Sequence, residues 1–266
     1  MPAEEGIRPA APAAAGLCAR DVTVRFGGLV ALQGVSLDVA DGEVVGLIGP
    51  NGAGKTTLFN VVCGFQRADA GEITWRGASL GRIRPHGLAG RGIARTLQGV
   101  GLFEGLTVAE NVMVGARGHR AGLLSALLGL PRADRDERAL RATALAALED
   151  LGVADAADRR PGELPFPVQK RVALARALVA EPDLLLLDEP AGGLGGEDLE
   201  ELADRIRALR GRMAILLVEH HMDLVMAVCD RVAVLDFGRL IATGTPAEVQ
   251  ADQAVIDAYL GVEVDA

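Results

Sequence analysis

The sequence has few cysteines and no long apolar run, and each absence excludes a class of protein. The 266 residues hold three cysteines, Cys18, Cys63 and Cys229, which are too few and too scattered for a disulfide framework or a metal cluster. This usage predicts a reducing compartment, the cytosol. No stretch approaches the roughly 18 consecutive apolar residues that a membrane-spanning helix needs, so we expect any work at a membrane to be done from its surface.

Basic residues are outnumbered, and lysine is almost missing. Lysine and arginine together number 27 against 36 acidic residues, which gives a net charge of −9 without any long basic run. Such a composition argues against a protein whose main task is to neutralise nucleic-acid phosphates. Only Lys55 and Lys170 are lysines, which raises the question of why arginine does not serve at these two positions.

The first 16 residues contain a proline- and alanine-rich run and lack the basic start and apolar centre of a secretion signal. We expect residues 1–16 to be a disordered tail. Nearly continuous apolar runs further along are typical of strands buried on both faces of a helix-covered parallel sheet. They lie at Val44–Ile48, Leu184–Leu187, Ala214–Val218 and Val232–Leu235. Alternating patterns predict a smaller, N-terminal antiparallel sheet over Leu17–Phe26, Val35–Val39 and Glu72–Trp75.

A helical pattern replaces the strand pattern from about residue 107 to residue 164. Leu140, Ala144, Leu148 and Leu151 follow one another at spacings of four, four and three residues, which places them on one face of a helix. Loop-like segments flank this stretch on both sides. We therefore expect an α/β protein in which a helical subdomain is inserted into a parallel-sheet core.

The segment after the first buried strand matches the phosphate-loop pattern G-x-x-x-x-G-K-[ST]. Its glycines let backbone N–H groups surround phosphate oxygens, the following helix adds its positive end, and Lys55 can reach the terminal phosphates as a compact cation. The Thr56 hydroxyl is the expected ligand of Mg²⁺. The alternative is a glycine-rich turn without a ligand. We expect a helix over Thr57–Cys63 and a nucleotide site formed by Gly49, Pro50, Asn51, Gly52, Ala53, Gly54, Lys55, Thr56 and Thr57.

Two adjacent carboxylates, Asp188 and Glu189, follow the apolar run Leu184–Leu187. The carboxyl ends of parallel strands form the ligand-binding edge of an α/β sheet. Asp188 suits the Mg²⁺ shell, directly or through water. Glu189, on the opposite face of an extended chain, is free to act as general base on an attacking water. Such a pair is often only a helix cap or a solvated turn, but the phosphate loop favours the catalytic interpretation.

The run Ala214–Val218 is followed by Glu219, His220 and His221. A histidine at that sheet edge can contact a γ-phosphate and the water held by the catalytic carboxylate. Metal chelation by His220 and His221 is the rival interpretation. We expect it to fail because adjacent residues point apart and no third ligand of suitable spacing is near.

These residues together resemble the ABC ATPase family, and the resemblance covers essentially all of residues 17–261. It implies ATP as the ligand, with Glu189 as the catalytic base and His220 as the switch histidine. Phe26 is similar in position to the aromatic residue that stacks on adenine, and Gln98 to the glutamine that senses metal and water. The segment from Lys170 to Leu178 is similar to the helix after the family signature.

Within that family, several strings are similar to the ATPase subunits of branched-chain amino-acid importers and their relatives for urea and short amides. They are Gly92–Gln98, Leu106–Val112, the extra loop Gly115–Arg132 and the ending Ala258–Gly261. The resemblance implies two integral-membrane permease subunits, a second ATPase subunit and an extracytoplasmic solute-binding protein as partners, and no nucleic acid. It places the chain peripherally at the cytoplasmic face of the cell membrane, with residues 262–266 as a C-terminal tail.

The signature segment departs from the family pattern Leu-Ser-Gly-Gly-Gln. Here it is Leu164-Pro165-Phe166-Pro167-Val168, followed by Gln169, and Pro167 replaces the second glycine. A later loop has Gly195 where the family has Asp or Asn. In the family both elements serve the ATP of the opposite subunit, whereas every element for this chain's own ATP is present. We therefore expect the second ATPase subunit to be a different chain. The alternative is that the loop Phe166–Val168 reshapes and offers another donor, such as Gln169, to the same phosphate.

Other classes of protein remain as alternatives. A soluble ABC ATPase acting on nucleic acid or ribosomes would need a long coiled coil, a duplicated cassette or a basic surface, and the sequence has none of these. A P-loop kinase or GTPase would leave the helical insertion and the downstream histidine unexplained. The string Asp236-Phe237-Gly238 resembles a protein-kinase motif, but no His-Arg-Asp loop accompanies it, and we expect a hairpin turn there.

Overall fold

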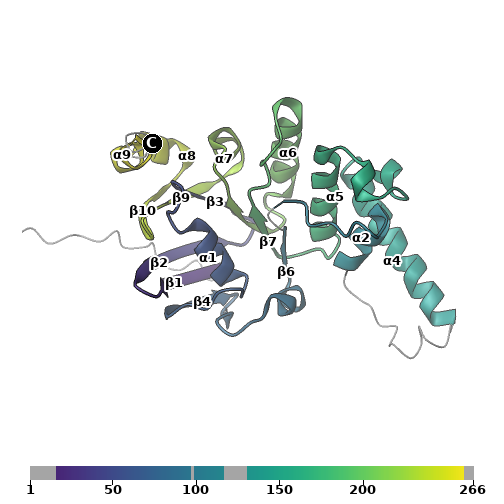
Figure 1. The fold of residues 1–266 in the computed structure, drawn as a ribbon, viewed down its shortest axis with the longest axis horizontal. Coiled ribbons are helices and arrows are strands. Elements are labelled where there is room, and N and C mark those ends of the chain that lie inside the picture. The colour runs from purple at the N-terminus through teal and green to yellow at the C-terminus, as the bar shows by residue number, and fades with distance from the viewer. Residues whose placement is uncertain (1–15, 97–98, 117–130, 261–266) are drawn as a thin grey trace, which may run out of the picture.

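The computed structural model describes residues 16–96, 99–116 and 131–260, which form two β-sheets and surrounding helices (Figure 1). The six-stranded sheet has the order β10-β9-β3-β8-β7-β6. Neighbouring strands are parallel except for β10, which pairs antiparallel with β9, so the predicted α/β class and parallel sheet are confirmed. The strands are β3 (Val44–Ile48), β6 (Ile93–Arg95), β7 (Leu184–Asp188), β8 (Ala214–Val218), β9 (Arg231–Asp236) and β10 (Arg239–Gly244).

Strand β7 shows why these strands are continuous apolar runs. Leu185 and Leu187 belong to the core on one face of the sheet, whereas Leu184 and Leu186 belong to the core on the other face. A strand that is buried on both faces needs an apolar side chain at every position.

Strand β6 lies at the edge of the sheet, beside β7, and the sequence pattern does not predict it. It has three residues, of which only Ile93 is buried, and it ends in Arg95. A strand this short shows no periodicity, which is why it is missed.

The second sheet has four strands in the order β2-β1-β4-β5, all antiparallel, and it confirms the smaller sheet expected near the N-terminus. Gly16 pairs with Ala40 and so belongs to this sheet and not to the expected tail, while residues 1–15 lie outside the described part. The inner face of the four-stranded sheet packs with α1 (Lys55–Val62) and the six-stranded central sheet into one core. The strands are β1 (Gly16–Phe26), β2 (Leu29–Ala40), β4 (Ala70–Trp75) and β5 (Ala78–Ser79).

Three helices form the inserted unit, drawn together at the right of Figure 1: α2 (Val108–Gly115), α4 (Pro131–Asp150) and α5 (Phe166–Leu178). Ala144, Leu148 and Leu151 are buried as their spacing predicts. Helix α5 packs against α2 and α4, so the helical unit continues beyond residue 164. The division into domains otherwise stays a prediction, and the predicted C-terminal tail lies outside the described residues.

The remaining helices contribute to the same core as the inserted unit. They are α6 (Gly196–Leu209), α7 (Met222–Val228), α8 (Pro246–Ala251) and α9 (Gln253–Leu260). Helix α8 begins at a capping box in which Thr245 and Glu248 satisfy each other's backbone N–H groups, which fixes the start of the C-terminal pair.

Candidate active site

The predicted phosphate loop, acidic pair and histidine meet at one edge of the central sheet. Strand β8 lies between β3 and β7, and its last residue, Val218, pairs with Leu47 on one side and Asp188 on the other. The segments that leave these three strands therefore emerge side by side, at the edge where α/β proteins bind ligands.

The phosphate loop leads directly into helix α1, which begins at Lys55 and not at Thr57 as predicted. Gly54 precedes it with φ 103°, a left-handed conformation that favours glycine. Within the described part of the chain no side chain caps this helix start, and the first turn carries no acidic residue. Backbone N–H groups at such an end are available to an anion, so this loop fits the phosphates of a nucleotide.

The Lys55 side chain lies folded over the phosphate loop. Its Nζ donates to the carbonyl oxygens of Gly49 at 2.6 Å and Pro50 at 2.9 Å, and the residue is only 9% exposed. Burial lowers the pKa of the Lys55 ammonium, and the negative charge of Glu189 opposes that shift. A buried cation so close to the uncapped helix start can exchange its carbonyl partners for phosphate oxygens.

Asp188 is the last residue of β7, and its N–H donates to the Thr96 hydroxyl at 3.3 Å. Burial and the neighbouring Glu189 raise the pKa of the Asp188 carboxyl, while the Arg95 guanidinium opposes them. A carboxylate whose charge is disfavoured in this way gains from a bound cation. The exposed Thr56 hydroxyl offers a second oxygen ligand, so the oxygen donors present fit Mg²⁺.

Glu189 does not continue the strand as expected. Its φ is 46°, a left-handed conformation that is uncommon outside glycine, and its N–H donates to the carbonyl of Val218 at 2.9 Å. The expectation of an extended chain is therefore wrong, because the backbone turns at this residue. The turn brings the Glu189 carboxylate to 4.0 Å from Nδ1 of His220, which follows β8.

Glu219 is a fully buried carboxylate that the sequence interpretation does not use. Its Oε1 accepts from the N–H of Ala191 at 2.7 Å, and its Oε2 accepts from the N–H groups of His220 at 2.8 Å and His221 at 3.0 Å. These bonds tie the segment after β8 to the segment after β7. The rule that singles out Asp188, an acidic residue directly after a buried strand, also finds Glu219.

The two histidines do not point apart, which corrects the geometric reason for excluding a metal there. Their ring centroids are 4.4 Å apart, and Nδ1 of His221 lies 3.2 Å from Oε2 of Glu219. The ligand atoms of Glu219, His220 and His221 all lie within 4.8 Å of one another. That Oε2 already accepts two backbone N–H groups, however, so chelation would compete with bonds that hold the loop.

The other residues assigned to this chain's own nucleotide lie at the ends of elements. Phe26 ends β1 and is 49% exposed, so its ring is accessible to a planar base. Gln98, the expected metal- and water-sensing glutamine, lies outside the described residues.

The phosphate loop has two further contacts that the sequence does not indicate. The hairpin turn between β9 and β10 is confirmed, with Asp236 paired to Arg239, and the Gly238 N–H donates to the Ala53 carbonyl at 3.0 Å. The second involves Tyr259 on α9, whose hydroxyl lies near the Gly49 backbone. Burial raises the pKa of this hydroxyl, and the nearby Gly49 backbone opposes the rise.

The predicted signature segment forms the start of helix α5. Leu164 is buried and Pro165 precedes the helix, so Phe166 and Pro167 are its first two residues. Pro167 has no N–H to donate at a helix end where donors are otherwise free. The Gln169 side chain, the alternative donor, has one of its two N–H groups engaged, because its Nε2 donates to the Leu164 carbonyl at 2.9 Å.

The loop after Glu189 ends at Gly195, which precedes helix α6. Among the residues that the structure describes, no side chain caps that helix start. The Asp or Asn that the family resemblance implies at this position would place an oxygen there, as helix caps require. The structure thus places both departures from the family pattern, Pro167 and Gly195, at helix starts.

Comparison with known proteins identifies the family. Residues 32–192, more than half of the chain, match the family described as ABC transporter, and the chain belongs to this family as an ATP-binding and ATP-hydrolysing transporter subunit. Residues 239–265, at the C-terminal end, also match the family described as branched-chain amino acid ATP-binding cassette transporter.

The chain is similar to curated proteins over nearly its full length. It is 41% identical over 248 residues to the "High-affinity branched-chain amino acid transport ATP-binding protein LivG" of Salmonella typhimurium, covering 92% of this chain and 97% of the relative. It is 39% identical over 243 residues to the corresponding protein BraF of Pseudomonas aeruginosa, covering 90% and 95%. These relatives give no support to the alternative of an ATPase that acts on nucleic acid.

Solved structures agree with the fold. A nucleotide-free ATP-binding cassette from an ABC transporter has a TM-score of 0.79 and 31% identity, and the similarity covers 92% of this chain and 98% of that one. The ADP conformation of an ATP-binding cassette has the same TM-score and identity. Among the described residues, no helix combines the length and apolar character that crossing a bilayer requires.

Proposed function

We propose that this chain drives an importer of branched-chain amino acids or similar small polar solutes from the cytoplasmic face of the membrane. The C-terminal match at residues 239–265 and the names of the relatives in Salmonella and Pseudomonas support the solute class. Its partners in this proposal are two integral-membrane permease subunits, a second ATPase subunit and an extracytoplasmic solute-binding protein.

The convergence of three strand ends carries the proposed nucleotide chemistry. The loop from Gly49 to Thr57 binds the phosphates through backbone N–H groups and Lys55, with Phe26 stacked on the adenine. Thr56, Gln98 and Asp188 hold Mg²⁺, which screens the charge of the phosphates when bound.

Glu189 and His220 complete the proposed site. The Glu189 carboxylate acts as general base on the attacking water, a role that needs a carboxylate within hydrogen-bond reach of that water. His220, 4.0 Å from that carboxylate, orients the same water and contacts the γ-phosphate. The left-handed turn at Glu189 supports this role, because strained backbone is concentrated at functional sites.

The proposed docking site for a permease helix is a groove of about 530 Å³ beside the inserted unit. Phe103, on one wall, and Val114 of α2 are each 52% exposed, which is high for large apolar side chains. The segment that carries Phe103 is held in shape by Asn111, a fully buried residue whose side chain bonds both the N–H and the carbonyl of Phe103. An apolar patch on a preformed support suits an apolar partner helix.

A crosslinking experiment tests this docking site. A photoreactive group at Leu102 or Phe103 should crosslink to a permease subunit in the reconstituted transporter. The same group at exposed Asp204, on α6, should not. Crosslinks from Phe103 that reach only the second ATPase subunit would place the docking site elsewhere.

The solute is tested in a strain from which this chain has been deleted. Uptake of labelled leucine, isoleucine and valine should be lost and should return with the parent gene but not with a Glu189→Gln copy. Urea and a short amide are the comparison solutes. Recovery of urea uptake alone would replace branched-chain amino acids by the related solute class.

A further inference from the structure

Lys170, the second of the two lysines, is half-buried, and its side chain reaches the turn at the carboxyl end of β7. It is on the first turns of α5, and its Nζ donates to the carbonyl oxygens of Glu189 at 3.3 Å and Pro190 at 3.1 Å. It thus contacts the backbone of the proposed catalytic residue directly. We infer that Lys170 is a positioning residue that joins helix α5, whose start faces the partner's nucleotide in the family arrangement, to the turn that aims Glu189.

This inference rests on the proposed role of Glu189, and the backbone of that residue explains why it needs support. A left-handed φ outside glycine is unfavourable, and such a conformation persists only where its surroundings hold it. The Glu189 N–H donates to Val218 of β8, and the Glu189 carbonyl accepts from the Gly192 N–H at 3.2 Å within the turn and from Lys170 of α5 at 3.3 Å. Both ends of the turn are therefore fixed, by different elements.

The surroundings of Lys170 also explain why this position holds lysine and not arginine. Its ammonium lies 5.3 Å from the centre of the Phe166 ring in addition to its two carbonyl partners, so a compact cation with three donors fits the space. Burial lowers the pKa of Lys170, and the carboxylates of Glu219 and Glu189 oppose this. We therefore expect the planar fork of arginine to replace these contacts only in part.

Phe166 provides a second contact between the same elements. Gly193 has φ 77°, and a Cβ added there would lie 2.8 Å from Cε1 of Phe166, so the ring rests against the glycine backbone. The start of α5 therefore touches the segment after β7 at two points, Lys170 and Phe166. A displacement of α5 would be transmitted to the turn at Glu189 through both.

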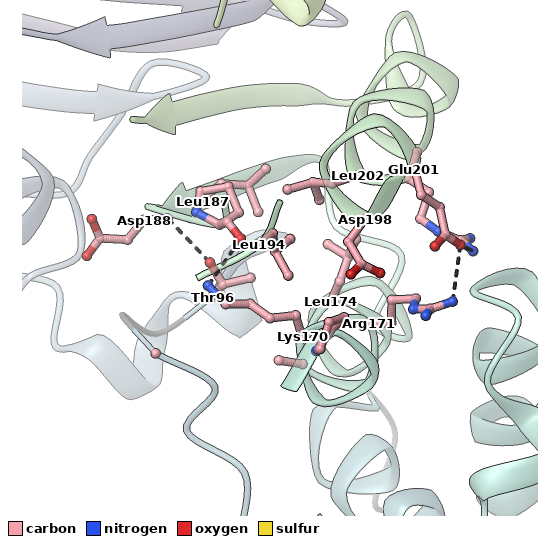
Figure 2. A pocket seen from close by; sticks show the side chains of 15 residues that line it. Thr96, Lys170, Arg171, Leu174, Leu187, Asp188, Leu194, Asp198, Glu201 and Leu202 are labelled. Carbon is pink, nitrogen blue, oxygen red and sulfur yellow. Dashed lines mark hydrogen bonds and ion pairs between the residues drawn. The ribbon is translucent and has the colours of Figure 1, made fainter. Parts of the chain in front are cut away.

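The cavity beside Lys170 is too small for it to be a ligand site. Figure 2 shows it between α5, α6 and the end of β7. Its volume is about 40 Å³, which has room for a few waters at most. Arg171, the next residue, is paired with Glu201 of α6 at 3.2 Å, on the side of the cavity away from Asp188. Arg171 is thus a matched control for Lys170.

The test compares steady-state ATP hydrolysis by Lys170→Met, Lys170→Arg and Arg171→Met in the full chain, purified with its transporter partners. We expect Lys170→Met to lower kcat at least about ten-fold with KM for ATP little changed, because small displacements of a catalytic group are costly in rate. Lys170→Arg should recover only part of kcat. Arg171→Met should keep kcat within about two-fold of the parent protein, because it leaves the Glu189 backbone untouched.

Several outcomes would overturn the inference. They are a parent-like kcat in Lys170→Met, an equal loss in Arg171→Met, and full recovery in Lys170→Arg, which would show that charge alone suffices. Assays are run well below the thermal midpoint of each variant, and Lys170→Arg carries the test where Lys170→Met does not fold. If Glu189→Gln hydrolyses ATP normally, the proposed function fails; if it is inactive while Lys170→Met is normal, only this inference fails.

Discussion

The face of the molecule proposed to bind this chain's own nucleotide differs from the face expected to serve a partner's nucleotide. The first face is built on the ends of β3, β7 and β8, and its loops are held by buried groups, above all Glu219 and Lys55. The second is built on the exposed starts of α5 and α6, where Pro167 and Gly195 occupy the positions of a donor and a cap. The departures from the family pattern fall on the second face alone.

This difference bears on how two such subunits would cooperate. A hydrogen bond to a charged group contributes roughly 1.5 to 3 kcal/mol. Losing one donor to a γ-phosphate therefore lowers the binding affinity or the rate of hydrolysis by about 10- to 100-fold. A homodimer would suffer that loss at both of its sites. A partner with an unaltered signature would leave one site whole, namely the one built from this chain's Lys55, Asp188, Glu189 and His220.

The largest effect is expected from Glu189→Gln. Placed in this chain, within an assembly that contains the neighbouring ATPase subunit, it should slow hydrolysis by roughly 10² to 10⁴, the usual contribution of a positioned general base. ATP binding should persist, and ATP should hold the closed dimer. The measurement is ATP turnover with the change in one subunit at a time.

The same change in the partner subunit is the matched control and should be mild. Equal losses from both substitutions, or a homodimer of this chain with full activity, would contradict the asymmetric arrangement.

Lys55→Ala should act on binding, with an affinity for MgATP lower by at least roughly 10² because charge-assisted contacts to phosphate are lost. The fold should remain, since the substitution also removes an ammonium that is costly to bury. Titration with nucleotide measures the affinity, and thermal unfolding measures the fold. Undiminished affinity in a folded variant would remove Lys55 from the phosphate site.

Pro167→Gly tests the second face directly, because it restores an N–H to the start of α5. Hydrolysis at the partner's site should rise by about 10- to 100-fold. The measurement is made with Glu189→Gln in this chain, so that the site built by this chain is inactive. Tm should fall slightly, because glycine is less favourable than proline at a helix start. An unchanged rate at the partner's site would mean that another donor already serves its phosphate.

The sequence predicts the first face better than the second because the first depends on local signals. The run Val44–Ile48 and the glycine-rich loop after it are contiguous, and continuous burial of strands leaves a visible pattern. The contact of Lys170 with Glu189 joins residues 19 positions apart, in a helix and a turn, and no periodicity encodes it. The left-handed φ of Glu189 likewise follows from tertiary bonds and not from its residue type.

The smallest effect is expected behind the phosphate loop, at Tyr259 of α9. Its hydroxyl is buried and has no hydrogen-bond partner within the described part of the chain. Burial raises the pKa of this hydroxyl, and the nearby Gly49 backbone opposes the shift without forming a hydrogen bond of good geometry. A buried polar group without a partner costs roughly 1 to 3 kcal/mol. Tyr259→Phe removes that group and keeps the ring, so it should stabilise the fold.

The expected gain is about 1 kcal/mol, which for a chain of this size raises Tm by roughly 2 to 4 °C, with affinity for MgATP within about two-fold of the parent protein. Thermal unfolding and nucleotide titration measure both quantities. Tyr259→Ala is the control, because it also removes the ring that packs against the core and should therefore lower Tm. A lower Tm in Tyr259→Phe, together with weaker nucleotide binding, would mean that the hydroxyl does accept from the Gly49 N–H. Helix α9 would then support the phosphate loop through this bond. The first face would include α9 in addition to the phosphate loop and the ends of β3, β7 and β8.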